Sequence, residues 1–182
     1  MSKPKKSFIP LGIAILTVSN KRKGADDTTG FYLSNACTEA GHRVVHHEVL
    51  PHNKYQIRER VSALIVNAEV SVIVLNGGTG FASDNQTIPG IRPLLDSEIT
   101  GFGELFRQLS FVDIGPASMQ SQALAGLANR TLICALPGSG GAAKLAWEHL
   151  LRPQLDARQG PCNFVPHLLN ERCDDGASSC KN

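Results

Sequence analysis

The chain has 182 residues, of which 42% are hydrophobic and 19% charged, as in a globular domain with a full core. Its formal net charge of +2 argues against a nucleic-acid partner, because it provides no strong basic field. The apolar run 11–18 is too short to span a membrane, and the polar, basic start does not resemble a signal peptide. Five cysteines without a Cys-x-x-Cys pair argue against a zinc site or a disulfide framework and predict free thiols in a cytoplasmic protein.

Predicted strands and helices alternate along the chain. Runs 11–18 and 70–75 are nearly continuously apolar, which is typical of strands buried on both faces. The expected strands are 11–18, 43–50, 70–75 and 131–136, and the expected helices are 30–40, 54–67, 88–95, 101–110, 118–127 and 139–151. This alternation predicts an α/β fold with a mostly parallel sheet and helices on both faces.

The chain is expected to form one domain, residues 11–152, between a flexible N-terminal tail, residues 1–10, and a C-terminal extension. After Arg152, three X-Pro pairs predict an extended strap over residues 153–170, which would lie across its own domain or a neighbouring subunit. Residues 171–182 are small and polar and are expected to be disordered.

Three loops, 19–29, 77–87 and 137–141, leave the carboxyl ends of the predicted strands, where ligands of parallel sheets bind. In the second loop, the glycines of Gly77-Gly78-Thr79-Gly80 allow close approach of a ligand, and successive N–H groups can bind an anion. Taken alone, this tetrapeptide fits a plain turn as well as a phosphate site. The two other loops, also rich in small and polar residues, favour the binding site.

The remaining loop residues leave alternatives open. Gly138-Ser139-Gly140-Gly141-Ala142-Ala143 satisfies Gly-x-Gly-x-x-Ala, but no later strand provides the acid of a dinucleotide site, and no Walker A sequence exists. Ser139 fits either an anion site or an ordinary helix start. Asp27 fits either a helix cap or a Mg²⁺ ligand beside a nucleotide phosphate. The basic run 21–23 fits a solvated loop better than a screen for an anionic ligand.

Covalent catalysis has no candidate group in this sequence. The adjacent His46 and His47 lie on a predicted strand, so their side chains point to opposite faces and cannot bind one metal together. No nucleophile elbow, Cys–His pair or pair of catalytic carboxylates is evident.

Several segments, in order, resemble the molybdenum cofactor biosynthesis protein B and Mog family of molybdopterin-binding proteins. The resemblance covers roughly residues 8–170, and the final stretch is most similar to the protein B branch. The matching segments are residues 13–20, Asp27-Thr28-Thr29-Gly30, Glu39-Ala40-Gly41-His42, Gly77-Gly78-Thr79-Gly80, residues 101–107, Leu109-Ser110-Phe111, Leu136-Pro137-Gly138-Ser139, residues 153–158 and Pro161-Cys162-Asn163-Phe164.

The resemblance implies a three-layer α/β/α sandwich, a molybdopterin-binding domain over residues 11–152 and assembly as a homotrimer or hexamer. It also implies binding of molybdopterin and, in active relatives, its adenylylation with ATP and Mg²⁺, with Asp27 as the Mg²⁺ ligand. Other proteins of the molybdenum cofactor pathway are possible partners. The implied ligand-binding residues are Ser19, Asn20, Thr29, Gly30, Gly77, Gly78, Thr79, Gly80, Thr87, Pro137, Gly138 and Ser139.

Two departures from the pattern of active relatives concern catalysis. Where those relatives have an acid after the glycine loop, this chain has Asn85, with Asp84 one residue earlier. Where the adenylylating branch has an acid after Pro51, this chain has His52. The candidate catalytic residues are therefore Asp27, Asn85 and Asp84, and loss of a metal-binding carboxylate would weaken transition-state stabilisation.

Three functions remain open at this point. The chain could adenylylate molybdopterin, or bind it as a carrier or regulatory partner without catalysis, as the two departures suggest. It could also be an assembly module without a small ligand, if Phe102, Phe106 and Phe111 form an interface. An ordinary core stripe is the favoured interpretation of these three phenylalanines.

Overall fold

The computed structural model describes residues 7–22 and 24–169, which form a six-stranded sheet in the order β2-β1-β3-β6-β5-β4. The strands are β1 (Gly12–Val18), β2 (Arg43–Leu50), β3 (Val72–Asn76), β4 (Ser97–Glu98), β5 (Leu124–Ala128) and β6 (Thr131–Leu136). Strands β2, β1, β3 and β6 run parallel, and β5 is antiparallel to both of its neighbours. The prediction of a mostly parallel sheet is confirmed.

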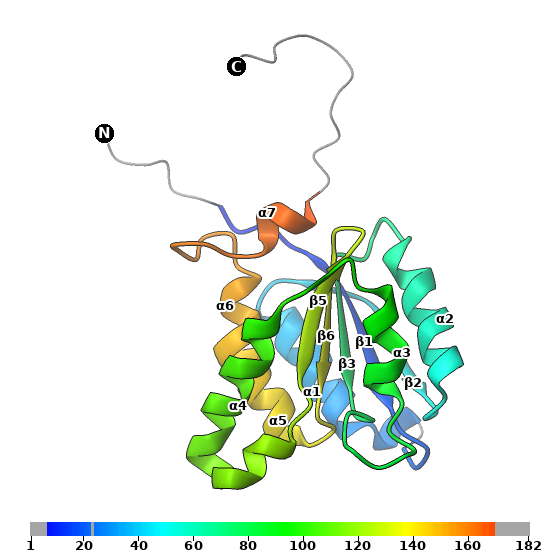
Figure 1. Ribbon diagram of the computed structural model, residues 1–182. Coiled ribbons are helices and arrows are strands. Elements are labelled where there is room, and N and C mark those ends of the chain that lie inside the picture. The colour runs from blue at the N-terminus through cyan, green and yellow to red at the C-terminus, as the bar shows by residue number, and fades with distance from the viewer. Residues whose placement is uncertain (1–6, 23, 170–182) are drawn as a thin grey trace.

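Helices cover both faces of this sheet (Figure 1). The main helices are α1 (Thr28–Glu39), α2 (Lys54–Ile65), α3 (Thr87–Ile91), α4 (Thr100–Ile114) and α5 (Gly140–Ala146), and a π-helix, Trp147–Leu151, continues α5. Helices α1, α4 and α5 pack against one face of the sheet, and α2 and α3 pack against the other. The molecule is therefore the expected three-layer sandwich.

The central strands bury side chains on both faces, as their continuous apolar runs predict. In β1, Ile13 and Ile15 join the core under α1, whereas Ala14 and Leu16 join the core under α2. The registers of β1, β3 and β6 bring Thr17, Asn76 and Leu136 side by side at the carboxyl ends of these strands. This edge is where the three predicted loops begin.

The helix predicted over residues 118–127 is wrong. A 3₁₀ helix, Gly115–Gln120, precedes β5, and β5 pairs with β6 through a turn at Asn129 and Arg130, whose φ angles are 45° and 63°. Alanine and leucine favour helices, and the turn lacks the Asn-Gly pair that usually marks such hairpins. Residues 124–128 form a strand because they are buried between β6 and β4 in the sheet. The short strand β4 was also not predicted.

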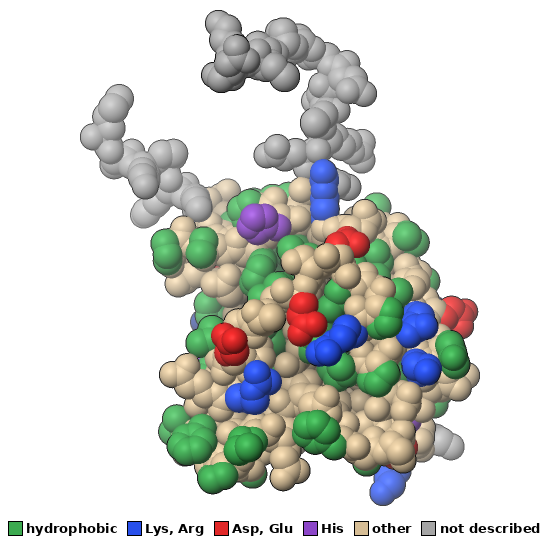
Figure 2. All heavy atoms as spheres, in the orientation of Figure 1, with side chains coloured by type: hydrophobic (Ala, Val, Ile, Leu, Met, Phe, Trp, Pro, Cys, Tyr) green, Lys and Arg blue, Asp and Glu red, His purple; other side chains and the backbone are tan. Residues whose placement is uncertain are grey.

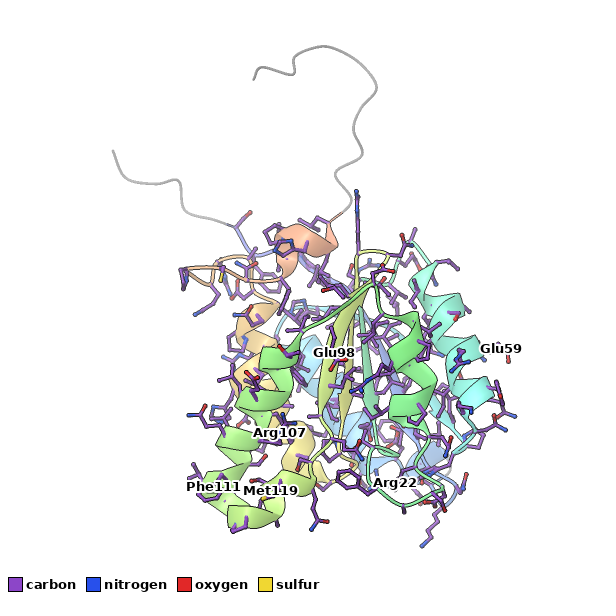
Figure 3. All side chains as sticks on the ribbon, in the orientation of Figure 1. Arg22, Glu59, Glu98, Arg107, Phe111 and Met119 are labelled. Carbon is purple, nitrogen blue, oxygen red and sulfur yellow. The ribbon has the colours of Figure 1, made fainter. Side chains whose placement is uncertain are left out.

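Helix α4 extends four residues beyond its predicted end at residue 110. Phe102 and Phe106 are buried, as a core stripe requires, but Phe111 is 58% exposed. The exposed apolar residues of α4 and the following turn, which we call the α4 apolar surface, are Leu105, Phe111, Val112, Ile114 and Met119. Figure 2 shows apolar side chains gathered at the lower left of the molecule, and Figure 3 places Phe111 beside Met119 there.

The C-terminal segment crosses its own domain instead of projecting from it. It contains the short helices α6 (Arg152–Gln154) and α7 (Val165–Leu168), and Leu155, Val165 and Leu168 are buried against the core under α1, α4 and α5. At the other end, Phe8 packs against the His42 ring. Residues 1–6 of the N-terminal tail expected over residues 1–10, and the whole expected C-terminal tail, residues 171–182, lie outside the described residues. Helices in the described part of the chain are too short or too polar to span a bilayer.

Candidate functional site

The glycine loop leaves β3 in a conformation that requires glycine. Gly77 and Gly78 have φ angles of 92° and 64°, and a Cβ at Gly77 would collide with the Val18 carbonyl oxygen. Thr87 stabilises the loop through two hydrogen bonds. Its hydroxyl donates to the Gly77 carbonyl at 2.7 Å, and its N–H donates to the Gly78 carbonyl at 2.9 Å. The Gly77 N–H donates to Leu136, whereas the N–H groups of residues 78–80 have no partner among the described residues.

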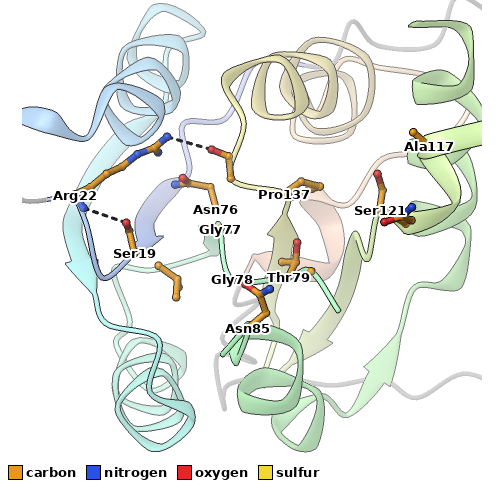
Figure 4. Close-up of a pocket in the computed structure, with 14 residues that line it drawn as sticks. Ser19, Arg22, Asn76, Gly77, Gly78, Thr79, Asn85, Ala117, Ser121 and Pro137 are labelled. Carbon is orange, nitrogen blue, oxygen red and sulfur yellow. Dashed lines mark hydrogen bonds between the residues drawn. The ribbon is translucent and has the colours of Figure 1, made fainter. Parts of the chain in front are cut away.

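The three predicted loops surround one cavity of about 440 Å³, the glycine-loop cavity (Figure 4). Its wall combines backbone of the glycine loop with amide, hydroxyl and small side chains. The lining residues are Val18, Ser19, Arg22, Asn76, Gly77, Gly78, Thr79, Gly80, Asn85, Ala117, Gln120, Ser121, Pro137 and Gly138. The convergence expected from the sequence is therefore observed.

A second cavity of about 720 Å³ adjoins the first and shares Ser19 and Arg22 with it. We call it the β2 cavity, since its wall includes the end of the edge strand β2. Asn20 and the half-exposed Phe31 line it together with His47 and Glu48. Asn20 thus faces the β2 cavity, and its carboxamide oxygen accepts a hydrogen bond from the His52 N–H at 2.9 Å.

Asp27 lies beneath the site as a fully buried carboxylate. It accepts hydrogen bonds from the Thr17 hydroxyl at 2.6 Å and from the Gly30 N–H at 2.9 Å, and its Oδ2 lies 2.9 Å from His47 Nε2. Burial raises the pKa of the Asp27 carboxyl, but the hydrogen bonds from Thr17, His47 and Gly30 outweigh this effect, so the pKa lies below its ordinary value. Asp27 caps helix α1, as one alternative predicted, and its role as a Mg²⁺ ligand stays a prediction.

Among the described residues, Arg22 is the one charged side chain that lines the glycine-loop cavity, although its basic run was expected to be a solvated loop. Its guanidinium donates to the Thr29 hydroxyl at 3.0 Å and to the Gly138 carbonyl at 3.4 Å, and it lies 3.8 Å from Asp27 Oδ1. Figure 4 shows this side chain reaching across to the turn that begins at Pro137. The Arg22 side chain is 32% exposed and has further N–H groups available for an anion.

The two departures from the catalytic pattern lie next to each other. Asn85 lines the glycine-loop cavity, whereas the neighbouring Asp84 has a side chain that is 67% exposed. The His52 ring lies 3.0 Å from the Asp84 carbonyl oxygen, which joins the end of β2 to the glycine-loop segment. Asn53 caps helix α2 through bonds from two N–H groups. At residue 85 the wall of the glycine-loop cavity therefore has an amide in place of a carboxylate.

Other predicted site residues support the wall rather than line it. Thr29 receives the Arg22 bond, and Gly30 leaves room for Asp27, whose carboxylate a Cβ at this position would strike. The Ser139 hydroxyl accepts from the Ala142 N–H and caps α5, which is the ordinary helix start. Asn76 and the cavity residues of segment 117–121 were not predicted. Residues 118–121 were assigned to a helix, and only the fold brings this segment to the edge of the sheet.

Comparisons with known proteins identify the family of this chain. Residues 14–157 match the family model described as "Probable molybdopterin binding domain". Molybdenum cofactor biosynthesis protein B of Escherichia coli K12 is 52% identical over 168 residues, which cover 92% of this chain and 99% of that protein, and the Bacillus subtilis protein of the same name is 39% identical over 142 residues, covering 78% and 84%.

Solved structures also match. A crystal structure of a molybdenum cofactor biosynthesis protein B superposes with a TM-score of 0.80 at 37% identity, covering 82% of this chain and 94% of that one. The tungsten cofactor synthesizing protein MoaB of Pyrococcus furiosus superposes with a TM-score of 0.70 at 29% identity, covering 76% and 89%. This chain belongs to the molybdopterin-binding domain family that includes the molybdenum cofactor biosynthesis proteins B.

Proposed function

We propose that the chain binds molybdopterin in the glycine-loop cavity as a protein of molybdenum cofactor biosynthesis. The observation that carries this proposal is a cavity with free backbone N–H groups, one cationic side chain and no carboxylate among the described residues of its wall. Such a wall favours an anionic ligand. The family membership and the relatives' shared name support molybdopterin, which carries a phosphate, as that ligand.

The donor set does not fit a Mg²⁺ ion held by the protein at this cavity. Mg²⁺ usually takes one or two carboxylates along with phosphate oxygens. Asp27 is fully buried and already bonded to protein groups, and Asp84 points largely to solvent. No group of three or more His, Cys, Asp or Glu side chains that could hold a metal occurs within residues 7–22 and 24–169. We therefore propose binding without adenylylation, and ATP and Mg²⁺ enter only as reagents of the test.

The test is incubation of the protein with molybdopterin and MgATP, followed by chromatographic assay of adenylylated product. The wild type should bind molybdopterin and form no product. The double substitution Asn85→Asp with His52→Asp introduces two acids near the cavity, so this variant should form adenylylated product where the wild type forms none. Asn35→Asp adds one negative charge at an exposed position of α1 and should leave the protein without adenylylated product. Product formation by the wild type at the rate of an adenylylating relative would refute binding without catalysis, and absence of molybdopterin binding would refute the function itself.

We also propose that the α4 apolar surface joins copies of this chain, as a homotrimer or a hexamer. Exposed apolar patches of this kind mark association sites. Val112→Ser combined with Met119→Ser should lower the assembly mass to that of the monomer in light scattering. Val66, 75% exposed on the α2 side, is a matched control for Val112, 82% exposed, and Val66→Ser should leave the mass unchanged. A monomeric wild type would contradict this proposal.

Two further parts of the proposal concern the setting of the protein. The described cysteines Cys37, Cys134 and Cys162 are free thiols, which supports a reducing cytoplasm. Other proteins of the molybdenum cofactor pathway are the proposed partners, since a bound cofactor intermediate must be received from one protein and passed to another.

A further inference from the structure

Asn76 holds the central place at the carboxyl edge of the sheet. It is the last residue of β3, it pairs in register with Thr17 of β1 and Leu136 of β6, and it is fully buried. It also lines the glycine-loop cavity, where Figure 4 shows it between Arg22 and Gly77. A carboxamide at this position is therefore both part of the core and part of the ligand-binding wall.

The protons of the buried network fix which way the Asn76 amide faces. Thr17 has one hydroxyl hydrogen, and it donates this hydrogen to the Asp27 carboxylate at 2.6 Å. The Thr17 oxygen can then only accept, so the Asn76 group that lies 2.8 Å away must be the Nδ2 amine. The Leu16 carbonyl oxygen, 3.5 Å from Nδ2, also requires a donor. Both neighbours therefore select the same orientation of the amide.

This orientation leaves the Asn76 carboxamide oxygen without a hydrogen-bond partner among the described residues. A buried acceptor without a partner weakens a folded protein, and such groups in native structures call for an explanation. Threonine, valine or leucine at the end of a buried strand would avoid the problem. A ligand that brings a donor to Oδ1 explains why the asparagine is tolerated.

We propose that Asn76 Oδ1 accepts a hydrogen bond from an N–H group of the ligand's heterocyclic ring, and so selects ligands with such a donor. This inference rests on the proposed function, because the pyrimidine part of a pterin offers an amino group and a ring N–H. Arg22 and Asn76 line the same cavity, so one ligand can meet both, its phosphate at the guanidinium and its ring at the amide. A ring without donors would leave Oδ1 buried and unpaired, and the site would reject it.

The experiment measures binding and stability on the same proteins. The probes are pterin, 3-methylpterin, which lacks the ring N–H, and 2-dimethylaminopterin, which lacks the amino donors, titrated by fluorescence. Wild type should bind one of the methylated probes roughly tenfold more weakly than pterin. Asn76→Leu, which keeps the shape but removes the acceptor, should bind pterin roughly tenfold more weakly and should bind that methylated probe as well as it binds pterin.

Stability without ligand separates recognition from a structural role. Asn76→Leu removes the unpaired buried oxygen together with the Nδ2 bond to Thr17, so the two effects offset each other and its urea midpoint should stay close to that of the wild type. The matched control is Asn163, a buried asparagine that donates to Ala157 and Gln159 and accepts from the Val165 N–H. Asn163→Leu should lower the midpoint and leave pterin affinity unchanged. Asn76→Val, which is smaller and also has no acceptor, provides the same comparison if the leucine variant does not fold.

Two outcomes overturn the inference. One is equal affinity of wild type for all three probes, and the other is pterin binding by both Asn76 variants at the wild-type level, which would mean that a water alone satisfies Oδ1. If molybdopterin binds under either outcome, the proposed function stands and only the role of Asn76 fails. If wild type binds neither molybdopterin nor pterin, the proposed function itself fails.

Discussion

Replacing Arg22 with glutamine should weaken binding of molybdopterin by about tenfold and abolish most of its dependence on ionic strength. A hydrogen bond to a charged group contributes about 1.5–3 kcal/mol, and the partial exposure of the guanidinium favours the lower part of this range. Arg22 is the only cation on the described wall of the glycine-loop cavity, so no other described residue of this wall can replace its charge. The measurement is the dissociation constant of molybdopterin at low and high salt, for wild type and variant.

Two controls make this result specific. Lys21→Gln removes the same charge from an exposed neighbour in the loop and should change affinity by less than about twofold. Arg22→Lys keeps the charge but loses the planar fork, so it should recover only part of the affinity. Chelation of Mg²⁺ with EDTA should leave wild-type affinity unchanged, because the described part of the cavity wall offers no carboxylate for the ion. Equal losses in the Arg22 and Lys21 variants, or loss of binding in EDTA, would contradict this account.

The sequence predicts the framework of this site because the framework depends on local patterns. The apolar runs of β1, β3 and β6 are long and unambiguous, and loops that follow such strands must meet at one edge of a parallel sheet. The glycine loop is recognisable for the same reason, since positive φ angles at Gly77 and Gly78 restrict the choice of residue. The sequence therefore places the glycine-loop cavity at the carboxyl edge of the parallel strands.

Contacts between residues far apart in the chain are the part of the site that could not be predicted from the sequence. Asp27 and His47 are 20 residues apart, and only the pairing of β2 with β1 beside helix α1 brings the carboxylate to the imidazole. Arg22 belongs to a basic run that resembles a solvated loop. Its guanidinium nevertheless donates a hydrogen bond to the carbonyl of Gly138, which lies 116 residues later in the sequence. From the sequence, Asn76 is only a polar residue at the end of a strand. That its carboxamide oxygen has no hydrogen-bond partner among the described residues can be recognised only once the neighbouring protons are assigned in the structure.

The hairpin of β5 and β6 shows a different limit. Residues 124–128 are mainly alanine and leucine, which favour helices, and the turn at Asn129 and Arg130 adopts positive φ angles without glycine. Tertiary burial between two strands overrides local preference here. This strand conformation also affects the site, because segment 117–121 lies at the cavity wall only when β5 is a strand.

Asp27→Asn should lower the free energy of unfolding at pH 7 by roughly 1–3 kcal/mol, although the substitution keeps the shape of the side chain. The asparagine Oδ1 can still accept from the Gly30 N–H, but its Nδ2 would present hydrogens to Thr17 and His47 in place of an acceptor. Thr17 would then lose the acceptor for its own hydrogen, and the orientation that fixes Asn76 would no longer be enforced. Molybdopterin affinity should therefore fall together with stability.

The pH dependence of this loss identifies its cause. The pKa of Asp27 in the folded protein lies below the ordinary value of 3.8, so the ionised carboxylate stabilises the fold above that pH. As the pH falls through the lowered folded pKa, the carboxyl takes up a proton and the advantage of aspartate over asparagine disappears. Urea unfolding of wild type and variant should give the largest difference near neutral pH and a shrinking difference below about pH 4. Asp26→Asn, at the exposed neighbouring acid, should show little difference at any pH. A difference between wild type and Asp27→Asn that stays constant with pH would mean that packing, and not the charge of Asp27, holds helix α1 and the Thr17–Asn76 pair in place.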